Sequence, residues 1–237
     1  MDLFQNVKAV QERVAAAAAA AGRSPRSVAL CAATKVQTDD TIRAAIAAGI
    51  RLCGENRVQE LTAHLAAGAY ASAQVHFIGH LQTNKVKQVV GKVSLIHSVD
   101  SDRLLRAIDS QAEKLGIVQD ILLEVNIARE ESKGGCLPEA LPDLVRAAQD
   151  FHHIRLRGLM AIPPVSRLPG ENRRYFSQMR NLFVDITEKM SDNQDVMDCL
   201  SMGMSADYED AIAEGATLVR VGTALFGPRP PMGGAPA

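Results

Sequence analysis

Residues 218–227, LVRVGTALFG, combine a short apolar run with a turn of small residues, and they are the last of a series of similar segments. Val219 and Val221 flank Arg220, so the period-two alternation of a β-strand places Arg220 on the face opposite the two valines. Gly222 and Thr223 then end the run. The segment therefore predicts a strand that carries a guanidinium toward a turn rich in hydrogen-bond donors.

Earlier segments are β-rich in the same way, which makes about eight in total. They are SVALCAA (27–33), IRLCGE (50–55), VHFIG (75–79), SLIHSVD (94–100), DILLEVN (120–126), IRLRGLMAI (154–162) and DCLSMG (198–203). The helix patterns between them include TDDTIRAAIAAG (38–49), ENRVQELTAHLAAG (55–68), SDRLLRAIDSQAEKLG (101–116), LPEALPDLVRAAQD (137–150) and RRYFSQMRNLFVDITEKMS (173–191). Strands that alternate with capped helices predict βα units, and eight such strands close a parallel barrel.

We therefore expect an α/β fold, a single (β/α)8 TIM barrel, as one domain over residues 1–227. Apolar residues at helical spacing near the N-terminus predict an extra helix over residues 1–22 that packs on the barrel. The Pro- and Gly-rich segment 228–237 predicts a disordered tail. An open doubly wound sheet is the competing architecture, and it is less favoured because no GxGxxG motif follows the first strand.

The amino-acid composition is that of an ordinary globular protein. The 237 residues include 47% hydrophobic and 22% charged residues with a formal net charge of -1, which favours neither nucleic-acid nor membrane binding. Cys31, Cys53, Cys136 and Cys199 show no CxxC or metal-ligand spacing, which predicts reduced thiols and no metal site. The first residues lack the basic start of a signal peptide, and no apolar run reaches membrane length, so we expect a cytoplasmic protein.

A parallel barrel builds its site at the carboxyl ends of the strands, and the loops after the seventh and eighth strands often hold a phosphate group. The candidate residues in these two loops are Ser201, Gly203, Met204, Ser205, Gly222 and Thr223. Their backbone N–H groups and hydroxyls are suited to an anion. Two ordinary turns built from Gly and Ser are the alternative.

Two cations stand at predicted strand ends. Lys35 directly follows the first strand, and a lysine at a barrel mouth is a candidate Schiff-base amine because desolvation lowers its pKa. A solvated lysine at the strand end is the alternative. A buried Arg220 requires an anion or acceptor, and an ion pair with Glu55 or Glu124 is the alternative to a ligand. Many further polar residues are predicted at the same rim, and such a concentration favours a ligand pocket. The other residues predicted there are Asn56, His76, Gly79, His97, Asp100, Asn126 and Met160.

In its motifs the chain resembles the pyridoxal phosphate homeostasis proteins of the PROSC or YggS type. The matching motifs are TK (34–35), GENRVQE (54–60), HFIGHLQTNK (76–85), HSVD (97–100), EVNIAREESKGG (124–135), GLMAIPP (158–164), LSMGMSADYEDAI (200–212) and VRVGTALFG (219–227). They run in order along nearly the whole chain. The last two are specific enough to make a chance match a poor explanation.

The resemblance implies a fold similar to the barrel domain of alanine racemase, with pyridoxal 5′-phosphate bound as an aldimine to the lysine after the first strand. Lys35 is then the Schiff-base residue, and Arg220 faces the pyridine nitrogen, where a permanent cation disfavours the protonated ring and weakens the cofactor as an electron sink. The phosphate contacts implied are Ser201, Gly222 and Thr223. Asn56 and Met160, at the ends of their strands, complete the predicted cofactor contacts.

This chain departs from the family pattern at two places. The family commonly has SKTKP where this chain has TKVQT (34–38), so the second lysine and the proline are absent, with Val36 and Gln37 in their place. His80 stands where many members have proline. At His80 we expect a local loop change without loss of binding.

The resemblance favours a monomeric homeostasis protein that is not an enzyme, limits free pyridoxal phosphate and hands it to apo-enzymes. A fold-type III amino-acid racemase is the alternative, and it requires a second base opposite the lysine. Tyr70, Tyr175 and Tyr208 are not obviously placed for that role, and the chain ends soon after its last motif without a further domain to supply one. An aldolase-type Schiff-base barrel is disfavoured because such lysines usually come from later strands.

Overall fold

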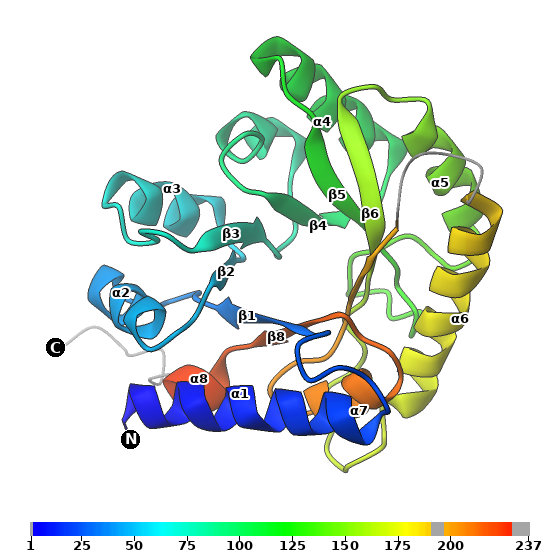
Figure 1. The fold of residues 1–237 in the computed structure, drawn as a ribbon. Coiled ribbons are helices and arrows are strands. Elements are labelled where there is room, and N and C mark those ends of the chain that lie inside the picture. The colour runs from blue at the N-terminus through cyan, green and yellow to red at the C-terminus, as the bar shows by residue number, and fades with distance from the viewer. Residues whose placement is uncertain (1, 191–196, 229–237) are drawn as a thin grey trace, which may run out of the picture.

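Eight parallel strands close into a barrel in which β8 pairs with β1 (Figure 1). The computed structural model describes residues 2–190 and 197–228. The strands are β1 (Ala29–Ala33), β2 (Leu52–Glu55), β3 (Gln74–Phe77), β4 (Leu95–Val99), β5 (Gln119–Glu124), β6 (Ile154–Met160), β7 (Cys199–Ser201) and β8 (Leu218–Val221). The predicted (β/α)8 barrel is therefore confirmed.

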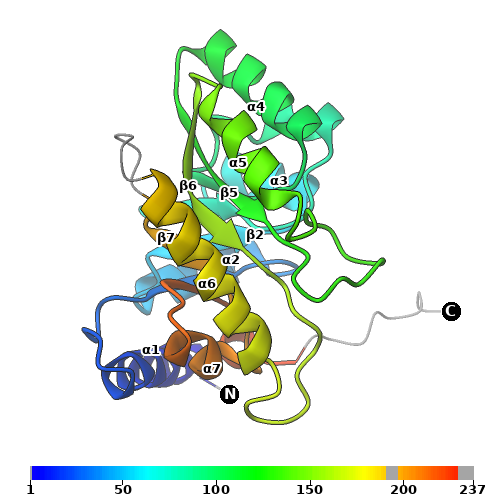
Figure 2. The ribbon, with the colours of Figure 1, turned by 90° about the vertical axis from the view of Figure 1, so that its right-hand side faces the viewer.

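Helices surround the barrel on its outside (Figures 1 and 2). They are α1 (Leu3–Ala20), α2 (Asp39–Ala47), α3 (Val58–Ala66), α4 (Asp102–Leu115), α5 (Leu141–Gln149), α6 (Arg173–Met190), α7 (Tyr208–Ala213) and α8 (Thr223–Phe226). The connection from β3 to β4 contains a short 3-10 helix, η1 (Thr83–Gln88), in place of an α-helix. Each strand is thus followed by a helical segment, as the sequence pattern predicts.

Helix α4 shows how the sequence produces this outer layer. Its buried residues Leu104, Leu105, Ile108 and Ala112 recur at helical spacing, so they form one apolar face toward the barrel. Gly116 ends the helix with φ 65°, in the left-handed conformation that glycine adopts without steric cost.

The inside of the barrel is filled by side chains. Inward residues form two small apolar clusters, which are Cys31, Leu52 and Leu218 in one and Leu95, Leu122 and Met160 in the other. The outward residues of the same strands join the larger core between the sheet and the helices. A packed interior leaves space for a ligand at the ends of the barrel.

Helix α1 lies alongside α7 and α8 (Figures 1 and 2). The side chain of Asn6 donates from Nδ2 to the carbonyl oxygen of Leu225 at 2.9 Å, and Arg13 Nε donates to Glu209 Oε1 at 2.8 Å. The N-terminal helix therefore packs against the last βα units. The division into one domain stays a prediction, and the tail predicted over 228–237 lies outside the described residues apart from Pro228.

Two classes of feature do not occur in the part of the chain that the structure describes. None of its helices combines the length and apolarity needed to span a bilayer. Its His, Cys, Asp and Glu side chains form no group of three or more that suits a metal ion.

The cysteines are free thiols, and burial raises the pKa of Cys53 to about 12.

Candidate functional site

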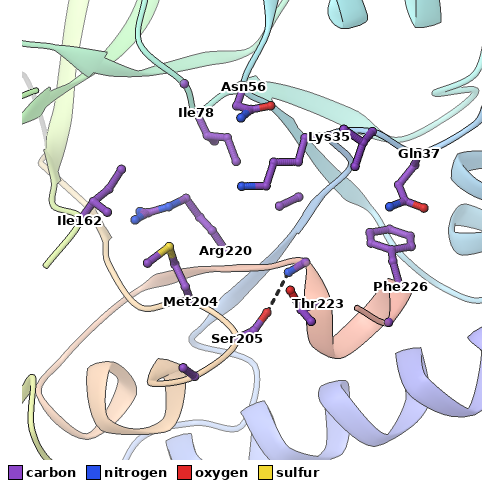
Figure 3. A pocket seen from close by; sticks show the side chains of 16 residues that line it. Lys35, Gln37, Asn56, Ile78, Ile162, Met204, Ser205, Arg220, Thr223 and Phe226 are labelled. Atoms are coloured by element: carbon purple, nitrogen blue, oxygen red, sulfur yellow. Dashed lines mark hydrogen bonds between the residues drawn. The ribbon is translucent and has the colours of Figure 1, made fainter. Parts of the chain in front are cut away.

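A cavity of about 340 Å³ lies at the carboxyl ends of the strands (Figure 3). Its walls come from the segments that follow β1, β2, β3, β6, β7 and β8, so it forms where a parallel barrel places its site. The side chains that line it include Lys35, Gln37, Asn56, Ile78, Ile162, Met204, Ser205, Arg220, Thr223 and Phe226.

Lys35 enters the cavity from the loop that follows β1 (Figure 3). The preceding residue, Thr34, is fully buried; its N–H donates to the carbonyl of Gly54, and its hydroxyl donates to Glu55 Oε1 at 2.5 Å. The following residue, Val36, has φ 59° and donates its N–H to Glu60 Oε2 at 2.9 Å. The backbone on both sides of Lys35 is therefore held by strand β2 and helix α3.

Glu55 anchors this loop from the outer face of the barrel. Its Oε1 accepts hydrogen bonds from the hydroxyls of Thr34 and Tyr70, and its Oε2 has no partner among the described residues. Burial raises the pKa of the Glu55 carboxyl above its usual value. Tyr70, which the sequence left without a role, thus supports the loop of Lys35 and does not line the cavity.

Arg220 extends from β8 into the cavity with only 4% of its surface exposed (Figure 3). Its Nη1 donates to Ser201 Oγ at 2.5 Å, and its Nη2 donates to the carbonyl oxygen of Ala161 at 2.9 Å. Among the described residues no carboxylate lies within ion-pair distance of it, so the alternative of a pair with Glu55 or Glu124 is wrong. Burial lowers the pKa of Arg220 from its ordinary value, and two neutral acceptors hold its cation.

The loops after β7 and β8 meet at Ser205. The backbone N–H groups of Gly222 and Ala224 donate to Ser205 Oγ at 3.1 and 3.3 Å, and Thr223 lies beside them (Figure 3). The β7 loop is tightly packed, because Gly203 has φ 90° and a Cβ there would stand 2.5 Å from the Cβ of Ala211. Two backbone N–H groups therefore hold the oxygen of Ser205, which keeps its own hydroxyl hydrogen to donate to an anion, as the phosphate interpretation requires.

The structure brings most of the predicted cofactor contacts together. Lys35, Asn56, Arg220, Gly222 and Thr223 line the cavity. Ser201 and Met160 do not: both are fully buried, and they pair with each other across β6 and β7 beneath the cavity. Their assignment as cofactor contacts stays a prediction.

Several lining residues were missing from the sequence-based cofactor contacts. Ser205 stood in the candidate phosphate loop, so the loop rule had already found it. Ile78, Ile162 and Phe226 lie within matching motifs, but an apolar side chain by itself gives no sign that it contacts a ligand. They supply the apolar part of the wall (Figure 3).

The residues present fit an aromatic aldehyde that carries a phosphate group. Asn56 Oδ1 is buried and accepts no hydrogen bond from the described residues, so an acceptor at the wall is available to a ligand. Lys35 supplies a primary amine, Ser205 with the β8 turn supplies donors for an oxyanion, and apolar side chains flank the space between them. This donor set matches pyridoxal phosphate.

A closed parallel barrel with a lysine after β1 and an arginine on β8 defines a protein of the alanine racemase barrel class. The family profile described as "Alanine racemase, N-terminal domain" matches residues 5–230. The alanine racemase of Clostridium difficile has a TM-score of 0.71 over 96% of this chain and 58% of that chain at 12% identity, which supports the fold alone.

Relatives with higher sequence identity identify the family within this class. A pyridoxal phosphate homeostasis protein of Aquifex aeolicus is 42% identical over 229 residues, which cover 97% of this chain and 99% of that protein. PipY of Synechococcus elongatus, whose structure is described as having PLP bound, has a TM-score of 0.78 at 35% identity, covering 92% of this chain and 100% of that one. The chain belongs to the pyridoxal phosphate homeostasis protein family, as its motifs indicate.

Proposed function

We propose that this protein binds pyridoxal 5′-phosphate in the cavity at the carboxyl ends of the strands and acts in intracellular vitamin B6 and amino-acid homeostasis. The observation that carries the proposal is that Lys35 and the donors around Ser205 line one cavity from opposite ends of the chain. The PipY structure described as having PLP bound supports it, since it matches 92% of this chain.

Each residue at the wall has a distinct part. Pyridoxal phosphate supplies an aldehyde carbon that combines reversibly with amines and a phosphate that accepts hydrogen bonds. The amine of Lys35 acts as the nucleophile, and the β1 loop holds it at the wall. The hydroxyls of Ser205 and Thr223 bind the phosphate oxygens, and the N–H of Gly222 holds Ser205 Oγ in place at 3.1 Å. Arg220, which cannot accept a proton, keeps a neighbouring ring nitrogen unprotonated.

The residues that line the cavity favour a carrier over a racemase. Racemisation requires a second proton-transferring base opposite the lysine. Among the described residues that line the cavity, Lys35 and Arg220 are the ionisable ones, and no Tyr, His, Cys, Asp or Glu lines it. Tyr70 donates to Glu55, and Tyr208 is buried under Arg13. We infer that the protein is non-catalytic, a cytoplasmic monomer that releases pyridoxal phosphate to apo-enzymes.

The test of binding is to mix the purified protein with pyridoxal phosphate, reduce it with borohydride and locate the adduct by peptide mass. We expect a visible absorption band and a stable adduct on Lys35, with both absent in Lys35→Ala. Lys133→Ala is the matched control, because Lys133 does not line the cavity but donates at 3.0 Å to the carbonyl of Pro163, which follows the lining residue Ile162. An adduct spread over several lysines, or one that persists in Lys35→Ala, contradicts the proposal.

The test of the carrier role uses the loaded protein. Incubation with each enantiomer of alanine should leave its optical purity unchanged, because the described cavity wall offers no second base. An apo-enzyme mixed with the loaded protein should regain activity as the absorption band of the carrier declines. Steady racemisation of alanine that is lost in Lys35→Ala would contradict the carrier role and support the racemase alternative.

A further inference from the structure

A chain of four hydrogen-bonded side chains crosses the interior of the barrel. Arg220 Nη1 donates to Ser201 Oγ, Ser201 Oγ lies 3.0 Å from His97 Nδ1, and His97 Nε2 lies 2.9 Å from His76 Nδ1. All four residues are at most 6% exposed. Nothing in the binding proposal uses the two histidines, although they are polar groups in a packed core, which require a physical explanation.

This chain connects two cavities. Arg220 lines the cavity at the carboxyl ends of the strands. His76 lines a second cavity, of about 490 Å³, whose wall includes Ala29, Gln74, Leu95 and Leu218. These four are the first residues of their strands, so the second cavity lies at the amino ends of the barrel. The hydrogen bonds therefore run from one end of the barrel to the other.

Both imidazoles are neutral near neutral pH. Burial, with the positive charge of Arg157 adding to it, lowers the pKa of His76 to about 4. Burial, followed by His76 and Arg220, holds the pKa of His97 well below its ordinary value. A neutral imidazole has one N–H and one acceptor nitrogen, so each ring donates at one end and accepts at the other.

Arg220 determines the direction of the chain. A guanidinium only donates, so Ser201 Oγ accepts from Arg220 and has one hydrogen of its own. If that hydrogen goes to His97 Nδ1, His97 Nε2–H donates to His76 Nδ1, and His76 keeps its hydrogen on Nε2. In the reverse order His97 donates to Ser201, and the Ser201 hydrogen must find a different acceptor.

The described residues decide between the two orders. They offer Ser201 Oγ no hydrogen-bond partner other than Arg220 and His97. The reverse order would leave a buried hydroxyl hydrogen unpaired, which costs about 1–3 kcal/mol. The first order satisfies Ser201 Oγ, both ring nitrogens of His97 and His76 Nδ1, and it leaves His76 Nε2–H for the second cavity.

We propose that Ser201, His97 and His76 form a directional hydrogen-bond relay that positions Arg220, with both histidines in the Nε2–H tautomer. Ser201 acts as the acceptor that orients the guanidinium, and His97 acts as the acceptor that orients Ser201. The histidines are positioning residues, because they act on the cavity through Arg220. Ser201 then has no hydrogen left for a ligand, and the phosphate is held at Ser205 and the β8 turn.

The tautomers are measured by two-bond proton–nitrogen correlation spectra of protein labelled with ¹⁵N at histidine. The signals of His76 and His97 are assigned from the variants His76→Gln and His97→Gln. We expect a protonated Nε2 and a bare Nδ1 in both rings between about pH 6 and 8. The spectra should not change when inorganic phosphate or pyridoxal phosphate is added. A protonated Nδ1 in either ring, a charged ring, or a reversal on adding phosphate overturns the proposal.

The positioning role is measured at Arg220 itself, by the hydrogen exchange rate of its side-chain N–H groups. His97→Leu removes the acceptor of Ser201, whereas His97→Asn keeps an acceptor oxygen near the position of Nδ1. We expect exchange at Arg220 to accelerate about tenfold in His97→Leu, the loss of one hydrogen bond, and to stay near the native rate in His97→Asn. Equal exchange rates at Arg220 in the native protein, His97→Leu and His97→Asn would overturn the positioning role of His97.

Ser201→Ala provides a second test should His97→Leu fail to fold. It removes the bond to Arg220 and keeps the two histidines in contact. Exchange at Arg220 should again accelerate, and His97 should lose its single tautomer, because its Nδ1 no longer has a donor. An unchanged tautomer and an unchanged exchange rate in this variant contradict the relay. These readouts require no bound cofactor, so they stand apart from the binding test at Lys35.

Discussion

Glu124 should make this protein less stable as the pH rises, and Glu124→Gln should remove that dependence. The residue stands at the carboxyl end of β5 with 6% of its surface exposed. Its carboxyl lies against Gly134, where a Cβ would stand 3.5 Å from Oε2. Burial raises the pKa of Glu124 to about 7, the charge of Asp100 adds to the rise, and Arg220 opposes it.

The direction of the effect follows from the pKa difference between the two states. The folded pKa is raised above the unfolded value, so the folded protein keeps a proton that the unfolded chain has already lost. The contribution of Glu124 to stability is therefore greatest below about pH 4.5 and falls until the pH passes about 7. One pKa unit corresponds to about 1.4 kcal/mol, so the rise from 4.5 to about 7 costs about 3 kcal/mol of folding free energy.

The assay is urea unfolding followed by circular dichroism at about pH 4, 6 and 8, which brackets this window. Glutamine resembles the neutral acid and cannot ionise, so Glu124→Gln should gain about 3 kcal/mol over the native protein between the lowest and highest pH. Glu131→Gln, at an exposed carboxylate, is the control and should differ by less than about 0.5 kcal/mol. A Glu124→Gln difference that is the same at every pH refutes the reasoning.

Other predictions concern the loops around the cavity. Ser205→Ala should weaken binding of pyridoxal phosphate about tenfold in calorimetry, since it removes the hydroxyl at the β8 turn, while Ser166→Ala, at a half-buried serine that does not line the cavity, should not. Gly79→Ala should lower the melting temperature and abolish binding, because its Cβ would stand 2.1 Å from the Asn56 carbonyl oxygen; native behaviour would refute this. Asn172→Ala should cost about 1–3 kcal/mol in urea unfolding, because it removes one of the two donors to the buried carboxylate of Asp207; a smaller loss would contradict that bond.

Much of the fold could be predicted because the evidence is local. Eight β-rich runs alternate with capped helices, and the runs are mostly apolar because the strands of a closed parallel sheet are buried on both faces. The inward direction of Arg220 also followed from local alternation with Val219 and Val221. The short helical segments η1 and α8 were not among the predicted helices, because each is only one or two turns long and shows no clear apolar periodicity.

The partners of Arg220 could not be predicted in this way. Glu55 was a plausible partner because it ends a strand, but β2 directs its side chain to the outer face, where Thr34 and Tyr70 hold it. Ser201 and Ala161 lie 19 and 59 residues from Arg220 in sequence. They reach it because β6, β7 and β8 are neighbours in the sheet.

Strand register decided how deep each residue lies. Ser201 pairs with Leu218, two residues before Arg220 on β8, so Ser201 lies one layer below the guanidinium. Four residues further along the chain, Ser205 reaches the cavity. A pattern of residue types contains no information about this stagger, because register is set by packing between strands that are distant in sequence.

The sequence by itself determined the strand count, the parallel barrel, the lysine after β1 and the family, because each rests on local periodicity or on ordered motifs. The tertiary structure alone decided which polar atoms meet. It placed Ser205 at the cavity, Ser201 beneath Arg220, and His97 next to a serine 104 residues away. The physical reason is that closing the barrel sets the distances between strands, and a buried polar atom must bond to whatever donor or acceptor that closure brings within reach.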